Sequence, residues 1–153
     1  MSRPHGFTVF EAMVVMLIIA IFAAIAMPNF STAIKRSKVR NNADLVAQTM
    51  RYAKESALNS NATIYVSVQG QNLCMSKVSA VGCELRSDPL TTDVSASMQD
   101  TSGASPSSIT SFSISGVYGT PAPKDVTFTL SSGSFSQSVN MNLIGIVTLG
   151  QMT

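Results

Sequence analysis

A long apolar run dominates the N-terminal end of the chain. From Phe7 to Met27 there are 21 residues, and Glu11 is the only strongly polar one. At about 1.5 Å of rise per residue, a helix of this length spans roughly 31 Å, which is close to the hydrocarbon thickness of a bilayer. A charged side chain at mid-membrane costs about 2.5–3.5 kcal/mol. We therefore expect a transmembrane helix in which Glu11 has a function and a positively charged partner.

An amphipathic helix pattern follows, from Phe30 to about Leu58. Its apolar positions recur at alternating steps of four and three, which places them in one stripe along the helix: Val39, Ala43, Val46, Met50, Ala53 and Ala57. We expect this stripe to pack on the domain that follows, and the helix to stop between Asn59 and Asn61. Pro28 separates the two patterns and predicts either a kink within one helix or a helix end.

The rest of the chain shows the patterns of β-strands and turns. Strands are expected at about 63–68, 73–78, 111–114, 126–130, 139–143 and 146–149, with Gly145 as a bulge between the last two. Between 87 and 111, 12 of 25 residues are Ser or Thr, which predicts a long polar loop. The fold class is therefore α+β: a long N-terminal α-helix, its first half transmembrane, packed on a C-terminal antiparallel β-sheet domain at 60–153.

Charged residues make up only 12% of the chain, and they are unevenly placed. Most of the basic side chains follow the apolar run, whereas none lies between Asp125 and Thr153; the cluster comprises Lys35, Arg36, Lys38, Arg40, Arg51 and Lys54. A basic cluster just beyond a membrane span is more often a solvated or headgroup-facing helix surface than a nucleic-acid site.

Motifs for catalysis are absent from the sequence. His5 is the only histidine, and no G-x-S-x-G, no phosphate-binding glycine loop and no metal-ligand spacing occurs. Four acidic residues are scattered through loop-like sequence, where a solvated surface role is expected rather than acid–base chemistry: Asp88, Asp93, Asp100 and Asp125. We expect neither enzymatic activity nor a cofactor or metal site.

The start of the apolar run carries a specific motif. A small residue, a phenylalanine, three uncharged residues and a glutamate precede the apolar helix, in the stretch Gly6 to Glu11. This motif resembles the signal of type IV prepilins, which a dedicated membrane peptidase cuts after the glycine and methylates at the new N-terminus. The resemblance implies cleavage between Gly6 and Phe7, N-methylation of Phe7, and pairing of Glu11 with the amine of an adjacent subunit in a filament. Buried charges of this kind are tolerable only when they are paired.

The resemblance divides the N-terminal part of the chain into segments. Residues 1–6 form the prepilin leader, 7–28 the transmembrane and filament-core helix, and 29–59 the amphipathic helix that continues into the globular domain. Pro28 then implies a bend or melted segment within the filament. The resemblance also implies a single-pass protein of the inner membrane, with a periplasmic C-terminal domain, that later joins an extracellular pilus. The Lys and Arg count on the two sides of the span would by itself place the C-terminus in the cytoplasm.

Three other interpretations of the apolar run compete with a prepilin signal. A simple membrane anchor leaves Glu11 unexplained. A secretory signal could use the A-x-A sequence at Ala24 to Ala26 as its cleavage site, but it is expected to carry positive charge near Glu11. A buried core helix is difficult to reconcile with 16 consecutive apolar residues from Ala12 to Met27 in a chain of this size.

Two cysteines, Cys74 and Cys83, enclose eight residues. In a cytosolic protein they would be free thiols, and a metal site lacks further ligands. In an exported domain, which the prepilin resemblance implies, they are expected to form a disulfide that closes a short loop. The chain-entropy contribution of such a loop to stability is roughly 2.5–3 kcal/mol.

The junction between the helix and the first strand, from Glu55 to Ile64, is similar to the GspH/FimT/FimU group of minor pilins and pseudopilins, as is the C-terminal strand around Gly145. The resemblance implies a minor pilin, a structural subunit that helps to initiate or cap a type IV pilus and assembles through its N-terminal helix. Its partners would be other major and minor pilins, the prepilin peptidase, the inner-membrane assembly platform and, before assembly, the membrane.

Two alternatives stay within the same group. One is a pseudopilin of a type II secretion system, which the cysteine pair disfavours. The other is a DNA-binding minor pilin that acts in DNA uptake. DNA is an unexpected partner, because no Lys or Arg follows Lys124 and phosphate contacts dominate DNA affinity.

Overall fold

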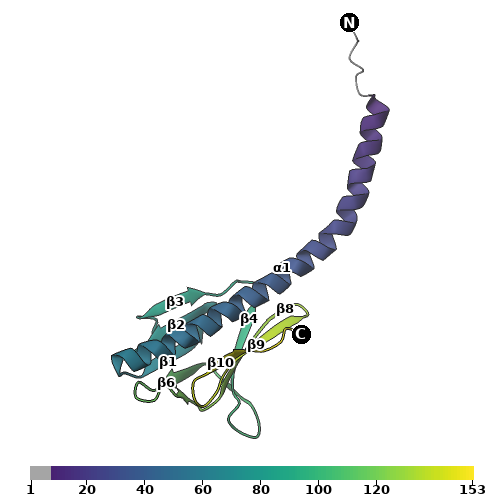
Figure 1. The fold of residues 1–153 in the computed structure, drawn as a ribbon. Helices are drawn as coiled ribbons and strands as arrows, with labels where there is room; N and C mark the ends of the chain where they lie inside the picture. The colour runs from purple at the N-terminus through teal and green to yellow at the C-terminus, as the bar shows by residue number, and fades with distance from the viewer. Residues whose placement is uncertain (1–7) are drawn as a thin grey trace. The chain divides into compact units, whose positions relative to one another are not determined.

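The computed structural model describes residues 8–153 (Figure 1). Its first element is the helix α1, Val9–Ser60, which is 52 residues long. Two compact units divide the chain, the first ending at Ile34 and the second comprising Lys35–Thr153. The predicted cleavage and methylation site at Gly6 and Phe7 lies outside the described residues.

The part of α1 that belongs to the first unit has no packing partner within that unit. None of the side chains described from 8 to 34 is buried, and Phe10, for example, is 77% exposed. By length and composition, α1 is apolar enough to cross a membrane. A helix with apolar side chains all around needs lipid or protein as its surroundings.

The second unit contains the rest of α1, whose predicted apolar stripe is fully buried: Val39, Ala43, Val46, Met50, Ala53 and Ala57. The helix ends at Ser60, and Asn61 follows in the left-handed region with φ 47°. The N–H groups of Asn61 and Ala62 donate to the carbonyls of Leu58 and Ala57, at 3.3 and 3.2 Å. This is the Schellman arrangement, in which Asn is one of the few residues that accept positive φ. The predicted helix stop is confirmed.

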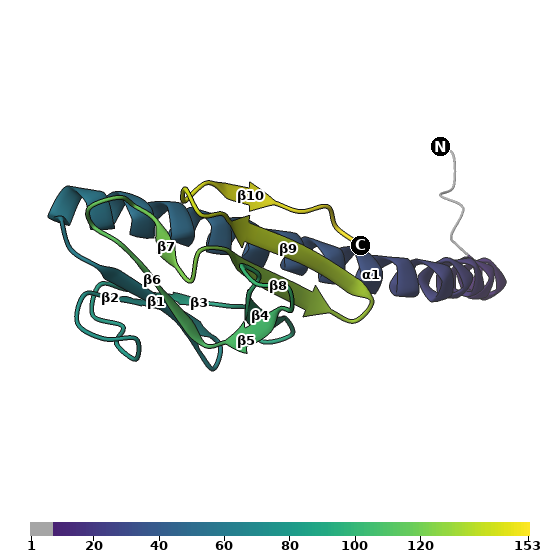
Figure 2. The ribbon, with the colours of Figure 1, turned by 90° about the horizontal axis from the view of Figure 1, so that it is seen from below.

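Within the described residues, the β-domain contains two five-stranded antiparallel sheets (Figures 1 and 2). In spatial order, the first sheet comprises β3 (Arg86–Pro89), β2 (Asn72–Ser76), β1 (Ile64–Gln69), β6 (Ser111–Ile114) and β7 (Pro121–Ala122). The second comprises β10 (Val147–Leu149), β9 (Phe135–Met141), β8 (Val126–Ser132), β4 (Ser95–Asp100) and β5 (Ser107–Ile109). The predicted α+β class with an antiparallel β-domain is confirmed.

One apolar face of each sheet joins the α1 stripe in a common core. In β8, Val126, Phe128 and Leu130 are fully buried and alternate with partly exposed residues, as the sequence pattern predicts. Phe112 of β6 meets Phe128 edge-to-face with ring centroids 6.1 Å apart, so that an aromatic pair connects the two sheets.

The prediction of a polar loop at about 87–111 is wrong. This segment contains β4 and β5 and most of β3, and β4 pairs with β8 from Ser95 opposite Ser131 to Asp100 opposite Val126. Leu90, Val94 and Met98 reach the core, while many of the Ser and Thr side chains lie on outward faces. A short strand that buries few side chains can have Ser and Thr at its other positions. The Ser- and Thr-rich composition of 87–111 therefore did not reveal the strands in this segment.

Gly145 interrupts the strand pattern between β9 and β10, as predicted, at the end of the loop that joins them. The chain reverses between β9 and β10, with the Asn142 N–H donating to the Ile146 carbonyl at 3.1 Å. Gly145 has φ 71° and its N–H donates to the Asn142 carbonyl at 2.7 Å. This is a three-residue hairpin loop that ends on a residue with positive φ, which glycine adopts without steric cost.

Candidate functional site

The first turn of α1 holds the acidic residue of the predicted assembly site. The Thr8 hydroxyl accepts a hydrogen bond from the Glu11 N–H at 3.2 Å, and the Thr8 carbonyl accepts from the Ala12 N–H at 3.2 Å. Thr8 is therefore the N-cap and Glu11 the third helical residue, the two positions of a capping box. A carboxylate there also interacts favourably with the helix dipole. The T-x-x-E spacing from Thr8 to Glu11 is typical of a capping box, and the sequence interpretation missed it.

Capping does not provide Glu11 with a positive partner. Its side chain is exposed among apolar neighbours such as Val14 and Val15, which are themselves exposed. The ion pairs found among residues 8–153 join Lys38 to Asp93 and Arg86 to Asp88, both in the second unit. Glu11 therefore has no ion-pair partner among the described residues.

The surface around Glu11 is suited to burial by other helices or by lipid. Large apolar side chains cover the helix on every side, among them Val9, Phe10, Met13, Met16, Leu17, Ile18, Ile19, Ile21, Phe22 and Ile25. Contiguous apolar surface on this scale marks a membrane or protein interface rather than a water-exposed surface. The structure thus combines an anchor with an acidic group that needs an external partner.

Pro28 lies inside α1, so the interpretation of it as a helix end is not supported by the structure. Next to it, the Asn29 side-chain amide donates to the Ile25 carbonyl at 3.4 Å. A proline removes one backbone hydrogen bond from the helix and weakens it locally. A kink at Pro28 stays a prediction.

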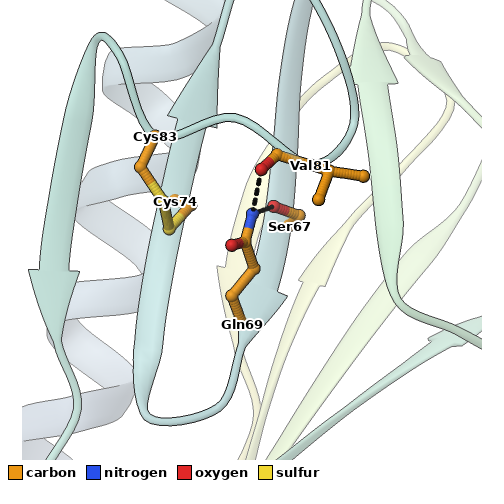
Figure 3. The surroundings of a disulfide bond; sticks show 5 residues. All are labelled: Ser67, Gln69, Cys74, Val81 and Cys83. Atoms are coloured by element: carbon orange, nitrogen blue, oxygen red, sulfur yellow. Dashed lines mark hydrogen bonds between the residues drawn. A yellow bond between two sulfur atoms is a disulfide. The ribbon is translucent and has the colours of Figure 1, made fainter.

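The two cysteines are joined in the structure, as predicted (Figure 3). The Cys74–Cys83 disulfide connects β2 to the segment that leads into β3. The same loop is held by the Gln69 side chain, whose amide donates to the Val81 carbonyl at 2.8 Å and to the Ser67 hydroxyl at 3.2 Å (Figure 3). Covalent and polar contacts together fix this loop on the first sheet.

Several members of the basic cluster contact the β-domain. The Lys54 ammonium donates to the carbonyls of Ile144 and Gly145 at 2.9 and 3.1 Å, and Arg51 reaches the Val147 carbonyl at 3.5 Å. These contacts attach the hairpin loop and β10 to α1, and β10 runs alongside the helix in Figure 2.

Lys38 binds a β-domain residue as well. Its ammonium donates to the carboxylate of Asp93, and this contact holds the pKa of Asp93 below its usual range. Lys38 and Lys54 are partly buried by these contacts, whereas Arg51 stays exposed, in agreement with the predicted solvated surface. Arg36 and Arg40 remain exposed.

Two buried polar residues of α1, which the sequence interpretation missed, attach the helix to β3 and to the segment that follows it. Asn42 donates to the Thr91 hydroxyl and accepts from the Thr91 N–H, both at 3.0 Å. Thr49 donates to the Asp88 carboxylate at 2.8 Å. Among the described residues, no group of three or more His, Cys, Asp or Glu side chains is placed to hold a metal ion.

Two family models match this chain, one at the N-terminal apolar segment and one over most of the second unit. Residues 1–27 match the family model described as "Prokaryotic N-terminal methylation motif", and residues 42–145 match "Type II transport protein GspH". A long helix with an exposed apolar start and a β-domain on its second half defines the class of pilin-like subunits. Since the second match covers more than half of the chain, the protein belongs to the GspH family of minor pilins and pseudopilins.

Solved structures show the same fold. The type IV minor pilin FimU of Pseudomonas aeruginosa strain PAO1 is 16% identical, with a TM-score of 0.61 over 76% of this chain and 90% of that chain. A second crystal form of FimU gives 18% identity and a TM-score of 0.58 over 73% and 92%. The minor pseudopilin EpsH from the type 2 secretion system of Vibrio cholerae is 13% identical, with a TM-score of 0.55 over 73% and 95%. No curated protein sequence matches.

Proposed function

We propose that this protein is a minor pilin that helps to initiate or cap a type IV pilus and enters the filament through its N-terminal helix. The observation that carries the proposal is Glu11, a carboxylate on an exposed apolar helix with no cation near it in the described structure. Its function is structural, without enzymatic activity. FimU, a type IV minor pilin by description, shares the fold and supports this assignment.

Maturation creates the missing cation. Cleavage between Gly6 and Phe7 by the prepilin peptidase leaves an amine on Phe7, which the enzyme methylates. The amine then stands four residues before Glu11 in the sequence. In the filament, the amine of one subunit pairs with Glu11 of its neighbour, because an unpaired carboxylate among apolar helices costs several kcal/mol.

Before assembly, the apolar part of α1 anchors the subunit in the inner membrane with the β-domain in the periplasm. The assembly platform then transfers the subunit from lipid to the filament, where the helices of other pilins replace lipid around residues 9–34. The exposed apolar side chains of this range provide the contact surface in both environments.

The test separates the charge of Glu11 from its capping role. Glu11→Gln removes the charge but keeps a residue that a capping box accepts, whereas Thr8→Val removes the cap and keeps the charge. We expect E11Q to be processed and inserted normally but poorly incorporated, and T8V to be incorporated almost as wild type. The measurement is the ratio of subunit in sheared pili to subunit in membranes, with the mature N-terminus checked by mass spectrometry. Normal incorporation of E11Q would rule out the charge pairing.

A pseudopilin of a type II secretion system is the second candidate, because the family description names type II transport and EpsH shares the fold. The disulfide favours the pilus, since we expect none in a pseudopilin. Expression in a strain that lacks its own minor pilins, and in one that lacks the corresponding pseudopilin, distinguishes the two machines. Restored piliation without restored secretion supports the pilus assignment.

A further inference from the structure

Two arginines just beyond the apolar part of α1 have no role in the contacts described so far. Arg36 and Arg40 are exposed, and neither takes part in the ion pairs or side-chain hydrogen bonds found among residues 8–153. They are four residues apart on a continuous helix, so their side chains share one face. We call them the arginine pair.

Of the two lysines near the arginine pair, only Lys38 is held in an ion pair within the described residues. Lys38 is paired with Asp93, and Lys35 lies close enough to contribute to the lowered pKa of that carboxylate. Asp44 follows one turn after Arg40 and forms no ion pair in the described structure. Within the described residues, the stretch 35–40 therefore has four cations and one ion pair, and the arginine pair supplies its two exposed guanidinium groups.

The position of the arginine pair along α1 matches a lipid headgroup layer. No charged residue occurs between Glu11 and Lys35, and α1 from Val9 to Ile34 is about 39 Å long at 1.5 Å per residue. A bilayer with its headgroup regions is about 40–45 Å thick. Helix side chains lean toward the helix N-terminus, so both guanidinium groups lean back toward the membrane.

We propose that the arginine pair binds the phosphate groups of anionic phospholipids while the subunit is anchored in the membrane. The planar guanidinium group donates parallel hydrogen bonds to phosphate oxygens, which a lysine ammonium cannot match. The site also explains the positive charge on the exported side of the span, where topology rules would not place it. It requires the membrane-anchored chain but no filament.

Spin-labelled lipids test the site on the full chain reconstituted in phosphatidylcholine vesicles. We expect the motionally restricted lipid to show at least about a threefold preference for phosphatidylglycerol over phosphatidylcholine, a value below the factor of about five that one cation near an anionic surface contributes. The preference should fall toward one at about 1 M salt, because exposed charges are screened. No preference in the wild-type chain would overturn the proposal.

Paired variants locate the effect. R36Q/R40Q should lose the preference, whereas K77Q/K124Q, which removes two exposed charges elsewhere in the second unit, should keep it. A preference that survives in R36Q/R40Q, or that disappears equally in K77Q/K124Q, would contradict the proposed site. The outcome is independent of filament assembly, because a precursor that is never cleaved or incorporated still spans the vesicle membrane.

Discussion

Two glycines meet at close range where α1 contacts the C-terminal hairpin. Gly119 and Gly145 have φ values of 65° and 71°, and a Cβ on Gly145 would lie 2.4 Å from the Gly119 carbonyl oxygen. The Lys54 ammonium, which holds the hairpin through two carbonyls, would be 3.0 Å from the same Cβ. The attachment of hairpin to helix therefore depends on the absence of a side chain at residue 145.

Gly145→Ala should destabilise the β-domain more than Gly70→Ala does. Both glycines have positive φ, so both substitutions carry a backbone cost of about 1–2 kcal/mol, but a Cβ on Gly70 meets nothing within 4 Å. We expect Gly145→Ala to cost about 1–3 kcal/mol more, as overpacking against backbone does. Urea unfolding of both variants measures the difference, and equal losses would show that the hairpin moves away at no cost.

At the scale of elements, the wrongly predicted segment at 87–111 is informative about what the sequence could reveal. The α1 stripe and β8 follow strict periods over many residues, so their faces could be predicted. The strands β3 and β5 have only four and three residues and lie at sheet edges, where few side chains are buried. Each pairs on one side only, with the strand that precedes it in the chain, and contacts such as Asn42 with Thr91 that hold this segment on α1 are not indicated by any local pattern.

The same limits apply to the candidate site. The prepilin motif was readable because six consecutive residues carry it, and the disulfide because only two cysteines occur. The contact between Lys54 and the hairpin could not be predicted from the sequence, because it joins residues 90 positions apart. A lysine in a basic cluster gives no sign of which backbone carbonyl it will reach.

Met98 in β4 tests whether the 87–111 segment is a structural part of the domain. Its side chain is 2% exposed in the core, whereas the neighbouring Ser97 is exposed. Met98→Ala should lower the free energy of unfolding by about 2–4 kcal/mol, as large-to-small core changes do, and Ser97→Ala should change it by less than about 0.5 kcal/mol. Chemical denaturation measures both values. An unchanged free energy of unfolding for Met98→Ala would show that the segment 87–111 is not a structural part of the domain.

At the scale of the whole molecule, the two units differ in whether they contain a buried apolar core. The buried apolar core extends from Val39 to Val147, so it lies entirely within the second unit. The described part of the first unit contributes no buried side chain. Folding of the β-domain is therefore independent of membrane insertion, and the same subunit can remain folded in lipid and in a filament.

This independence leads to a prediction for a fragment that begins at Phe30. Since it contains the whole core and both cysteines, it should fold after export and show no reactive thiol. Reduction of the disulfide should lower its free energy of unfolding by roughly 2.5–3 kcal/mol, the value expected for a loop of this length.

The control is the double variant Cys74→Ala/Cys83→Ala, unfolded with and without reductant, because its stability should not respond to reductant. Two labelled thiols per exported chain would contradict the disulfide. Equal stability of the reduced and oxidised fragment would show that the hydrogen bonds of the loop, such as Gln69 with Val81, hold it without the disulfide.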